Sequence, residues 1–185
     1  MLLSAENLSI NFGSRQLLSQ VNFYLNEGDK VGILGINGTG KSTFLKVLSG
    51  QLPPDEGKLT RNPNVQISYL SQNPVMEDNA TLLEQVFLHF PAEFRQLNEY
   101  EAKSMLTKLG FTDFQQKVGT LSGGQRKRVA LAAALIHPAD VLVLDEPTNH
   151  LDAAMTAWLE ERLQRFRGGL LMITHDRYFL ERVAN

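Results

Sequence analysis

Eight consecutive residues, Gly35-Ile36-Asn37-Gly38-Thr39-Gly40-Lys41-Ser42, have the composition of a loop that binds phosphate. Three glycines in this loop lack a Cβ atom, so the backbone can wrap closely around an anion. An apolar run, Val31 to Leu34, precedes the loop, and a stretch with helical spacing of apolar residues follows it, which is the context that such a loop requires. Lys41 would reach the β- and γ-phosphates of a nucleoside triphosphate, and the Ser42 hydroxyl would bind Mg²⁺. A chance glycine-rich turn is the alternative, and the eight matched positions disfavour it.

A pair of carboxylates, Asp145 and Glu146, ends the apolar run that begins at Val141. In open α/β sheets, ligands bind at the carboxyl ends of the strands. Asp145 could hold Mg²⁺ through water, and Glu146 could polarise an attacking water molecule. A solvated pair at the end of a strand would be the better interpretation of these two residues alone. The glycine loop in the same chain favours the catalytic interpretation.

A third motif, Leu121-Ser122-Gly123-Gly124-Gln125, opens a helix that we expect to run to Ile136, before Pro138. The N-terminus of a helix offers backbone N–H donors and a positive dipole end to an anion. By itself the motif could be a flexible turn with Ser122 as the helix cap. One triphosphate does not need two separate phosphate-binding segments in one domain. Two domains that face each other head to tail would use both.

The elements that must position these motifs alternate between apolar runs and helical patterns. Antiparallel strands are expected before residue 26, and buried parallel strands at Val31–Leu34, Val141–Leu144 and Leu170–Ile173. This alternation predicts an α/β fold with a mainly parallel sheet, covered by helices on both faces, an N-terminal antiparallel β subdomain and a helical insertion. We expect residues 1–73 to form the first part of the nucleotide-binding core, 74–122 the helical insertion and 123–185 the rest of the core.

Composition restricts the class of protein. The chain has 185 residues, 43% hydrophobic content and a net charge of −2, so no global basic field favours nucleic acid or anionic lipid. It contains no cysteine, which excludes disulfides and thiolate metal sites. No apolar run approaches the roughly 18–20 residues of a membrane span, and the N-terminus lacks the pattern of a secretory signal. We therefore expect a soluble, cytoplasmic protein.

The motifs in this order resemble the ATP-binding cassette (ABC) family over essentially the whole chain. The resemblance implies ATP and Mg²⁺ as cofactors and a head-to-tail pair of cassettes that sandwiches two ATP molecules. It implies that Glu146 is the catalytic base, that His175 contacts the γ-phosphate and that Lys41 holds the phosphates. The positions that would bind nucleotide are Phe12, which would stack on adenine, Gly35, Ile36, Asn37, Gly38, Thr39, Gly40, Lys41, Ser42, Thr43, Gln72, Ser122, Gly123, Gly124, Gln125 and Asp152. The positions that would bind the metal are Ser42, Gln72 and Asp145.

Taken singly, some of these residues have simpler interpretations. Phe12 alone is better explained as packing in a half-buried strand, and Gln72 alone as a polar loop residue. His175 alone would be a histidine that hydrogen-bonds to backbone. Its place after Ile173-Thr174 favours the γ-phosphate role.

Two segments, Pro147–Asp152 and Thr174–Leu180, resemble the ABC-F branch, whose members carry two cassettes and act on the ribosome. We therefore expect a protein that uses ATP to switch its action on the ribosome or its RNA. The chain would be a fragment similar to the first cassette of such a protein, and alone it would hydrolyse ATP weakly. The ATPase subunit of a membrane transporter and an ATP-gated clamp on DNA are the alternatives. The charged arm of ABC-F first cassettes is missing after Tyr100. The basic run Arg126-Lys127-Arg128 is either a solvated helix face or a contact with phosphate or RNA.

Overall fold

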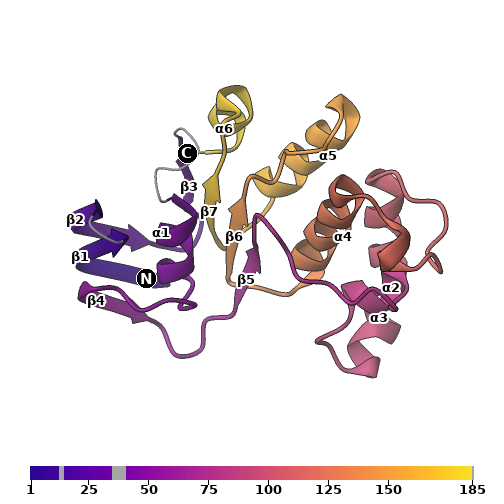
Figure 1. The fold of residues 1–185 in the computed structure, drawn as a ribbon, viewed down its shortest axis with the longest axis horizontal. Helices are drawn as coiled ribbons and strands as arrows, with labels where there is room; N and C mark the ends of the chain where they lie inside the picture. Colours follow the sequence, from indigo (N-terminus) through magenta and orange to yellow (C-terminus); the bar gives the residue numbers. More distant parts are fainter. Residues whose placement is uncertain (13–14, 35–40, 185) are drawn as a thin grey trace.

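The computed structural model describes residues 1–12, 15–34 and 41–184, which form two sheets and a set of helices (Figure 1). An antiparallel sheet has the order β2-β1-β4, with β1 at Leu3–Phe12, β2 at Arg15–Leu25 and β4 at Glu56–Arg61. A parallel sheet has the order β3-β7-β6-β5, with β3 at Lys30–Ile33, β5 at Ile67–Leu70, β6 at Val141–Asp145 and β7 at Gly169–Ile173. The helices are α1 at Lys41–Leu48, α2 at Leu82–Val86, α3 at Ala92–Lys108, α4 at Gly123–Ile136, α5 at Ala153–Gln164 and α6 at Arg177–Val183, with a 3₁₀ turn at Val118–Thr120.

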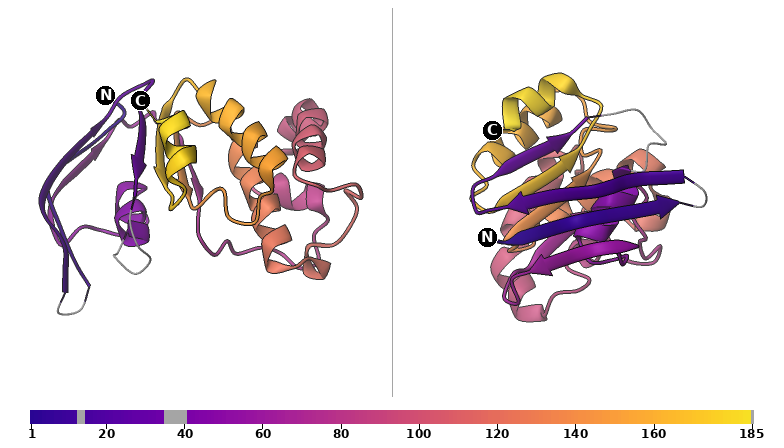
Figure 2. Two further views of the ribbon diagram at one scale, coloured as in Figure 1. Left: turned by 90° about the horizontal axis from the view of Figure 1, so that it is seen from above. Right: turned by 90° about the vertical axis from the view of Figure 1, so that its left-hand side faces the viewer.

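The parallel sheet is the middle layer of the molecule, and its two faces contribute to two different cores. Side chains alternate along a strand, so Val141 and Val143 of β6 pack on one side with α1 and the antiparallel sheet. Leu142 and Leu144 of the same strand pack on the other side with α2 to α6. Figure 2 shows this order of layers, with α1 between the two sheets and the remaining helices beyond the parallel sheet. Strands buried on both faces explain the continuous apolar runs in the sequence.

The antiparallel sheet depends on one glycine. Asn7 of β1 has a φ of +50°, and Gly57 of β4, with a φ of +94°, lies against it. A Cβ atom at Gly57 would be 2.3 Å from the Asn7 carbonyl oxygen, closer than such atoms approach. Only glycine therefore allows β4 to pair with β1 at this irregular position.

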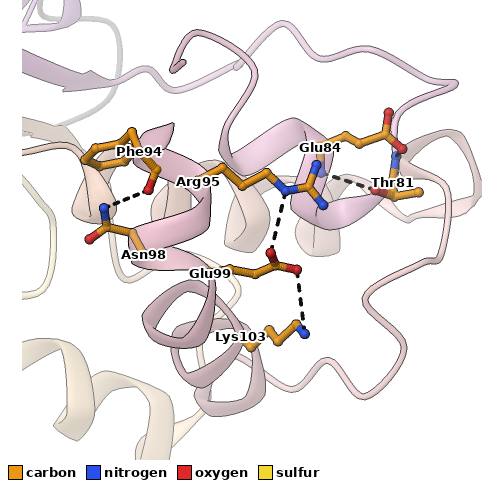
Figure 3. A network of polar contacts seen from close by, with 7 residues as sticks. All are labelled: Thr81, Glu84, Phe94, Arg95, Asn98, Glu99 and Lys103. Carbon is orange, nitrogen blue, oxygen red and sulfur yellow. Dashed lines mark hydrogen bonds and ion pairs between the residues drawn. The ribbon is translucent and has the colours of Figure 1, made fainter. Parts of the chain in front are cut away.

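The helical part of the chain is fixed by local polar contacts on its surface (Figure 3). Thr81 caps α2 by accepting from the Glu84 N–H, and Glu84 accepts in return from the Thr81 N–H. Interaction of the Glu84 carboxyl group first with the Thr81 side chain and then with the Thr81 backbone N–H holds the pKa of Glu84 below its usual value. Along α3, Glu99 lies one turn from both Arg95 and Lys103 and pairs with them. The apolar side of these helices packs on α4.

The predicted fold class is confirmed, since the antiparallel subdomain, the parallel sheet and the helices on both of its faces are all present. Helix α4 begins and ends at the predicted residues, and the three predicted parallel strands are shifted by at most one residue at an end. One strand, β4, was not predicted from the sequence.

Candidate active site

The carboxyl ends of β3, β6 and β7 are tied together by backbone hydrogen bonds at one edge of the parallel sheet. The N–H of Glu146, just after β6, donates to the carbonyl of Ile173 at 2.8 Å. The N–H of Thr174, just after β7, donates to the carbonyl of Ile33 at 3.2 Å. Residues that follow these strands are therefore held at fixed positions relative to one another.

Glu146 and His175 form a direct side-chain pair at this edge. Glu146 Oε1 faces His175 Nδ1 within ion-pair distance, and the His175 N–H donates to Glu146 Oε2 at 3.3 Å. The Glu146 side chain is 4% exposed, and the His175 side chain is 43% exposed. The imidazole thus holds a buried carboxylate in place while its own ring remains accessible to a ligand. Each side chain comes from a different strand end, as the predicted roles require.

The backbone at Glu146 is in the left-handed region, with a φ of +52°. This conformation is uncommon for a residue with a side chain, and it persists only where the surroundings enforce it. Here the bond from the Glu146 N–H to Ile173 and the contacts with His175 supply that constraint. The conformation directs the carboxylate to the strand-end edge, where a reacting group would lie.

Asp145, the last residue of β6, is 1% exposed, so two adjacent carboxylates are buried together. Tyr69 of β5 lies close enough for Asp145 to act on it. Burial first, and the charge of Asp145 second, raise the pKa of Tyr69 to about 12. The Tyr69 phenol is therefore neutral at physiological pH.

The N-terminus of α4 is presented outward. Ser122 caps the helix by accepting from the Gln125 N–H, and the Gln125 side chain accepts from the Ser122 N–H. A Cβ atom at Gly123 would meet nothing within 4 Å, whereas one at Gly124 would lie 3.1 Å from the His150 ring. Gly123 thus faces open space, and Gly124 allows His150 to pack on the helix end.

A cavity of about 400 Å³ lies between this helix end and the loops that follow β5 and β6. It is lined by residues 72–74, by Gly123, Arg126 and Lys127, and by Asn149 and His150. Gln72 is exposed at its rim. The cavity therefore brings Gln72 together with the start of α4.

Several predicted residues contribute in other ways. Asp152 caps α5, because its side chain accepts from the Met155 N–H at 2.8 Å. Gly35 to Gly40 lie outside the described residues, and the structure does not describe the side chains of Phe12, Lys41 and Ser42. Lys41 and Ser42 begin α1, and Thr43 behind them is half-buried. The backbone of α1 therefore starts where a strand–loop–helix anion site needs a helix N-terminus.

The buried carboxylates fit a magnesium ion. Hard divalent cations prefer oxygen ligands, and buried negative charge needs a nearby cation. In the part of the chain that the structure describes, no cluster of three or more histidine or acidic side chains could hold a metal. The predicted set of Ser42, Gln72 and Asp145 contains one carboxylate, would leave the remaining ligands to water and phosphate, and stays a prediction. Mg²⁺ would supply charge neutralisation at the phosphates there.

Two residues near the site were not singled out as functional by sequence. His150 packs on Gly124, and Lys127 of α4 is half-buried and lines the same cavity as Gln72 and His150. Lys127 stood in a basic run that was interpreted only as a whole. Its position four residues after Gly123, on one side of a helix, was the available signal.

Among the described residues, no helix combines the length and the apolar character that spanning a bilayer requires.

Known proteins match this chain along its whole length. The family model described as "ABC transporter" matches residues 18–149. The chain is 39% identical to the uncharacterized ABC transporter ATP-binding protein YfmR of Bacillus subtilis, and the match covers all of this chain and 35% of YfmR. It is 35% identical to the energy-dependent translational throttle protein EttA of Escherichia coli, and the match covers 92% of this chain and 38% of EttA. The chain thus spans about a third of the length of these relatives.

The fold is that of a solved cassette. The dimeric structure of MJ0796, a bacterial ABC transporter cassette, superposes with a TM-score of 0.84 over 98% of this chain and 91% of that one, at 24% identity. The match to YfmR extends over 221 aligned positions, more than the 185 residues of this chain, so the relative has segments without a counterpart here. From the motifs, the fold and these relatives, the chain belongs to the ABC transporter family and is an ATP-binding cassette of the kind that hydrolyses ATP.

Proposed function

We propose that this chain is an ABC-F type cassette whose hydrolysis of ATP switches the protein on and off the ribosome. In this proposal Lys41 and the amides of the glycine loop hold the phosphates, and Asp145 with Ser42 and Gln72 holds Mg²⁺. Glu146 takes a proton from the attacking water, and His175 keeps Glu146 oriented and contacts the γ-phosphate.

The observation that carries the catalytic part is the pairing of Glu146 with His175 beside Asp145. A general base must be ionised and aimed at the water that it activates. Glu146 is almost fully buried, and the imidazole and backbone N–H of His175 both lie at its carboxylate. The pair therefore has the geometry of a base and its orienting group, as in other activated nucleophile systems.

The ribosomal part is supported by the relatives and by two segments of this chain. EttA, at 35% identity, is a translational throttle protein by name. The segments Pro147–Asp152 and Thr174–Leu180 carry the ABC-F resemblance, and both lie at the active-site edge. The second cassette, which would supply the facing signature motif, is either part of a longer polypeptide or another copy of this chain. The division at residues 73 and 122 belongs to the same proposal.

The test is the variant Glu146→Gln in the full-length protein. The amide cannot accept the proton, so ATP should bind but not be hydrolysed, and the closed state should accumulate. We expect the variant to sediment with ribosomes when ATP is present and not when ADP is present. Glu161→Gln, the same change at an exposed position of α5, is the matched control and should behave as wild type.

Two results would contradict the parts of this proposal separately. Normal ATP turnover by Glu146→Gln would remove Glu146 from the chemistry. Loss of turnover without any ATP-dependent sedimentation with ribosomes would leave the ATPase assignment intact and would remove the ribosomal role.

A transporter ATPase subunit is the second candidate, and one observation favours it. Val75 is 96% exposed, close to Gln72, where a membrane partner would dock. Copurification of the full-length protein with a membrane protein, and loss of that protein in Val75→Asp, would select this candidate. Copurification with ribosomes in both variants would select the first.

A further inference from the structure

The loop that follows β6 contains two residues with a left-handed backbone. Glu146 has a φ of +52° and His150 a φ of +65°. The Asn149 N–H donates to the Glu146 carbonyl at 3.3 Å, which closes a first turn. The Leu151 N–H donates to the Thr148 carbonyl at 3.2 Å, which closes a second turn that overlaps the first. The two turns make a compact loop, so the position of His150 follows from that of Glu146.

The ring of His150 packs against the first turn of α4. An ideal Cβ atom at Gly124 would lie 3.1 Å from His150 Cγ and Nδ1 and 3.2 Å from His150 Cβ. A Cβ atom at the neighbouring Gly123 would meet nothing within 4 Å, so the contact is particular to Gly124. Alanine stabilises a helix more than glycine does, so glycine at this position needs a reason outside the helix. The close approach of the imidazole is such a reason.

Other contacts near the start of α4 lead to the helical part of the chain. Arg126 Nη2 donates to Asp78 Oδ1 at 2.9 Å, on the surface beside α2. Arg128 Nη1 donates to the Leu109 carbonyl at 3.0 Å, at the end of α3. These two members of the basic run thus attach α4 to the segments that precede it. The contact with His150 leads instead to the loop after β6.

The cavity at this end of α4 leaves room for the helix to shift. It has a volume of about 400 Å³, and Gly123, His150 and Gln72 all line it. His150 itself is exposed, so its ring is not part of the hydrophobic core. The ring therefore fixes a distance between two segments without contributing much to the stability of the fold.

We propose that His150 is a positioning residue that fixes the start of α4, and with it the signature motif (Leu121–Gln125), relative to Glu146 of the same chain. This rests on the proposed function, in which Glu146 is the base and the signature motif faces the nucleotide of a second cassette. The ring is a spacer between α4 and the loop after β6. Docking of a second cassette on the signature motif of this chain is thereby transmitted to its own Glu146, and the two sites of a pair are coupled.

The experiment compares His150→Gly and His150→Phe with wild type in the full-length protein. Glycine adopts a positive φ without strain, so His150→Gly removes the ring and keeps the turn. Phenylalanine keeps a ring and removes the two nitrogens. Because a small displacement of a catalytic group slows a reaction strongly, the kcat of ATP hydrolysis should fall about tenfold in His150→Gly. It should stay within about threefold of wild type in His150→Phe.

The KM for ATP separates positioning from binding. It should change by less than about twofold in both variants, because the residues that would hold the phosphates are untouched. His150→Asn repeats the removal of the ring, since asparagine also tolerates a positive φ. The same loss of kcat is expected in His150→Asn. A loss in His150→Gly alone would come from a more flexible loop and would overturn the proposal.

Thermal unfolding tests the contact itself. In an otherwise wild-type chain, Gly124→Ala places a Cβ atom against the imidazole, so the melting temperature should not rise. In the His150→Gly background the same substitution is free of this contact and gains the helix preference of alanine. The melting temperature should then rise by about 2–4 °C. A rise of the same size in both backgrounds would show that the ring does not press on α4.

A matched control is His89→Gly, the same change at an exposed position of the turn after α2, which should leave kcat at the wild-type value. A merely structural role of His150 would lower the melting temperature of His150→Gly along with its kcat. We expect that melting temperature to remain within about 2 °C of wild type.

Two results in the His150 variants would overturn the proposal. A wild-type kcat in His150→Gly would mean that the ring positions nothing. An equal loss in His150→Phe would mean that the ring nitrogens matter and the spacing does not.

Failure of the proposed function would look different. Normal hydrolysis by Glu146→Gln would remove the base to which His150 is coupled, whatever the His150 variants show. Loss of hydrolysis in Glu146→Gln together with a wild-type kcat in His150→Gly would leave the proposed function intact and would overturn this inference alone.

Discussion

The carboxyl edge of β6 and β7 and the N-terminus of α4 are both assigned to the nucleotide site in our proposal, and they differ in how complete they are. At the first, Glu146 is buried and already in contact with His175. At the second, Ser122 and Gly123 are exposed, and a Cβ at Gly123 would touch nothing. In the proposed function, the catalytic side chains thus come from one chain, whereas the signature motif would face a second cassette. Substitutions in the first region should therefore reduce catalysis, and substitutions in the second should reduce the assembly of two cassettes.

The largest expected effect is at the buried region. Glu146→Gln should lower the single-turnover rate of ATP hydrolysis by about 10²–10⁴-fold, because a positioned general base contributes that much. The affinity for ATP should remain within about threefold of wild type, since the phosphates are held elsewhere. Rapid-quench measurement of the rate and fluorescence titration of the nucleotide check both parts. A proportional loss of binding and rate would place Glu146 in binding instead.

The exposed region should respond to a change that the isolated chain tolerates. Gly123→Asp meets open space, and an acidic residue suits a helix N-terminus, so stability should change by no more than about 0.5 kcal/mol. A negative charge facing the phosphates of a second cassette should nevertheless lower hydrolysis by about 10²-fold. Thermal unfolding and steady-state turnover test the two statements. An unaffected turnover would show that this helix end faces no nucleotide.

A smaller effect is expected at the exposed member of the buried pair. His175→Ala removes the group that orients Glu146 but leaves the carboxylate, so hydrolysis should fall by about 10–10²-fold. His175→Gln, which can still donate toward Glu146, should recover part of the loss. Single-turnover rates of the two variants give the comparison. Equal losses in both would mean that the imidazole acts on the nucleotide alone.

The smallest effect separates structure from function at Asp152. Asp152→Ala removes the cap of α5 and should cost about 1 kcal/mol of unfolding free energy, whereas Asp152→Ser retains a capping oxygen and should cost little. Denaturant unfolding measures both. If Asp152 also contacts a second cassette, both variants should lower turnover alike. If turnover falls only in the variant that loses stability, the role of Asp152 is structural.

The contrast between two strands shows what the sequence could predict. Residues 141–145 of β6 are all buried, and a continuous apolar run is the expected pattern for such a strand. In β4 only Leu59 is not exposed, so its six residues carry no alternation to recognise. Its pairing depends on Gly57 fitting against Asn7 of β1, a contact between distant residues that local patterns do not contain.

The candidate site likewise has one part that the sequence predicted and one part that it did not. Motif content predicted which residues lie at the edge, because parallel strands end on one side of their sheet. It did not predict that Glu146 adopts a positive φ or that Lys127 is half-buried in the cavity at the start of α4. Both depend on how distant parts of the chain pack together, which local patterns do not contain.

The most direct measurement is the initial rate of ATP hydrolysis by residues 1–185 as a function of protein concentration. If each active site needs the signature motif of a facing cassette, the rate should rise with the square of concentration while the chain is mostly monomeric. Substantial turnover that rises linearly from the lowest concentration would show that a single chain completes the site, and it would contradict the account.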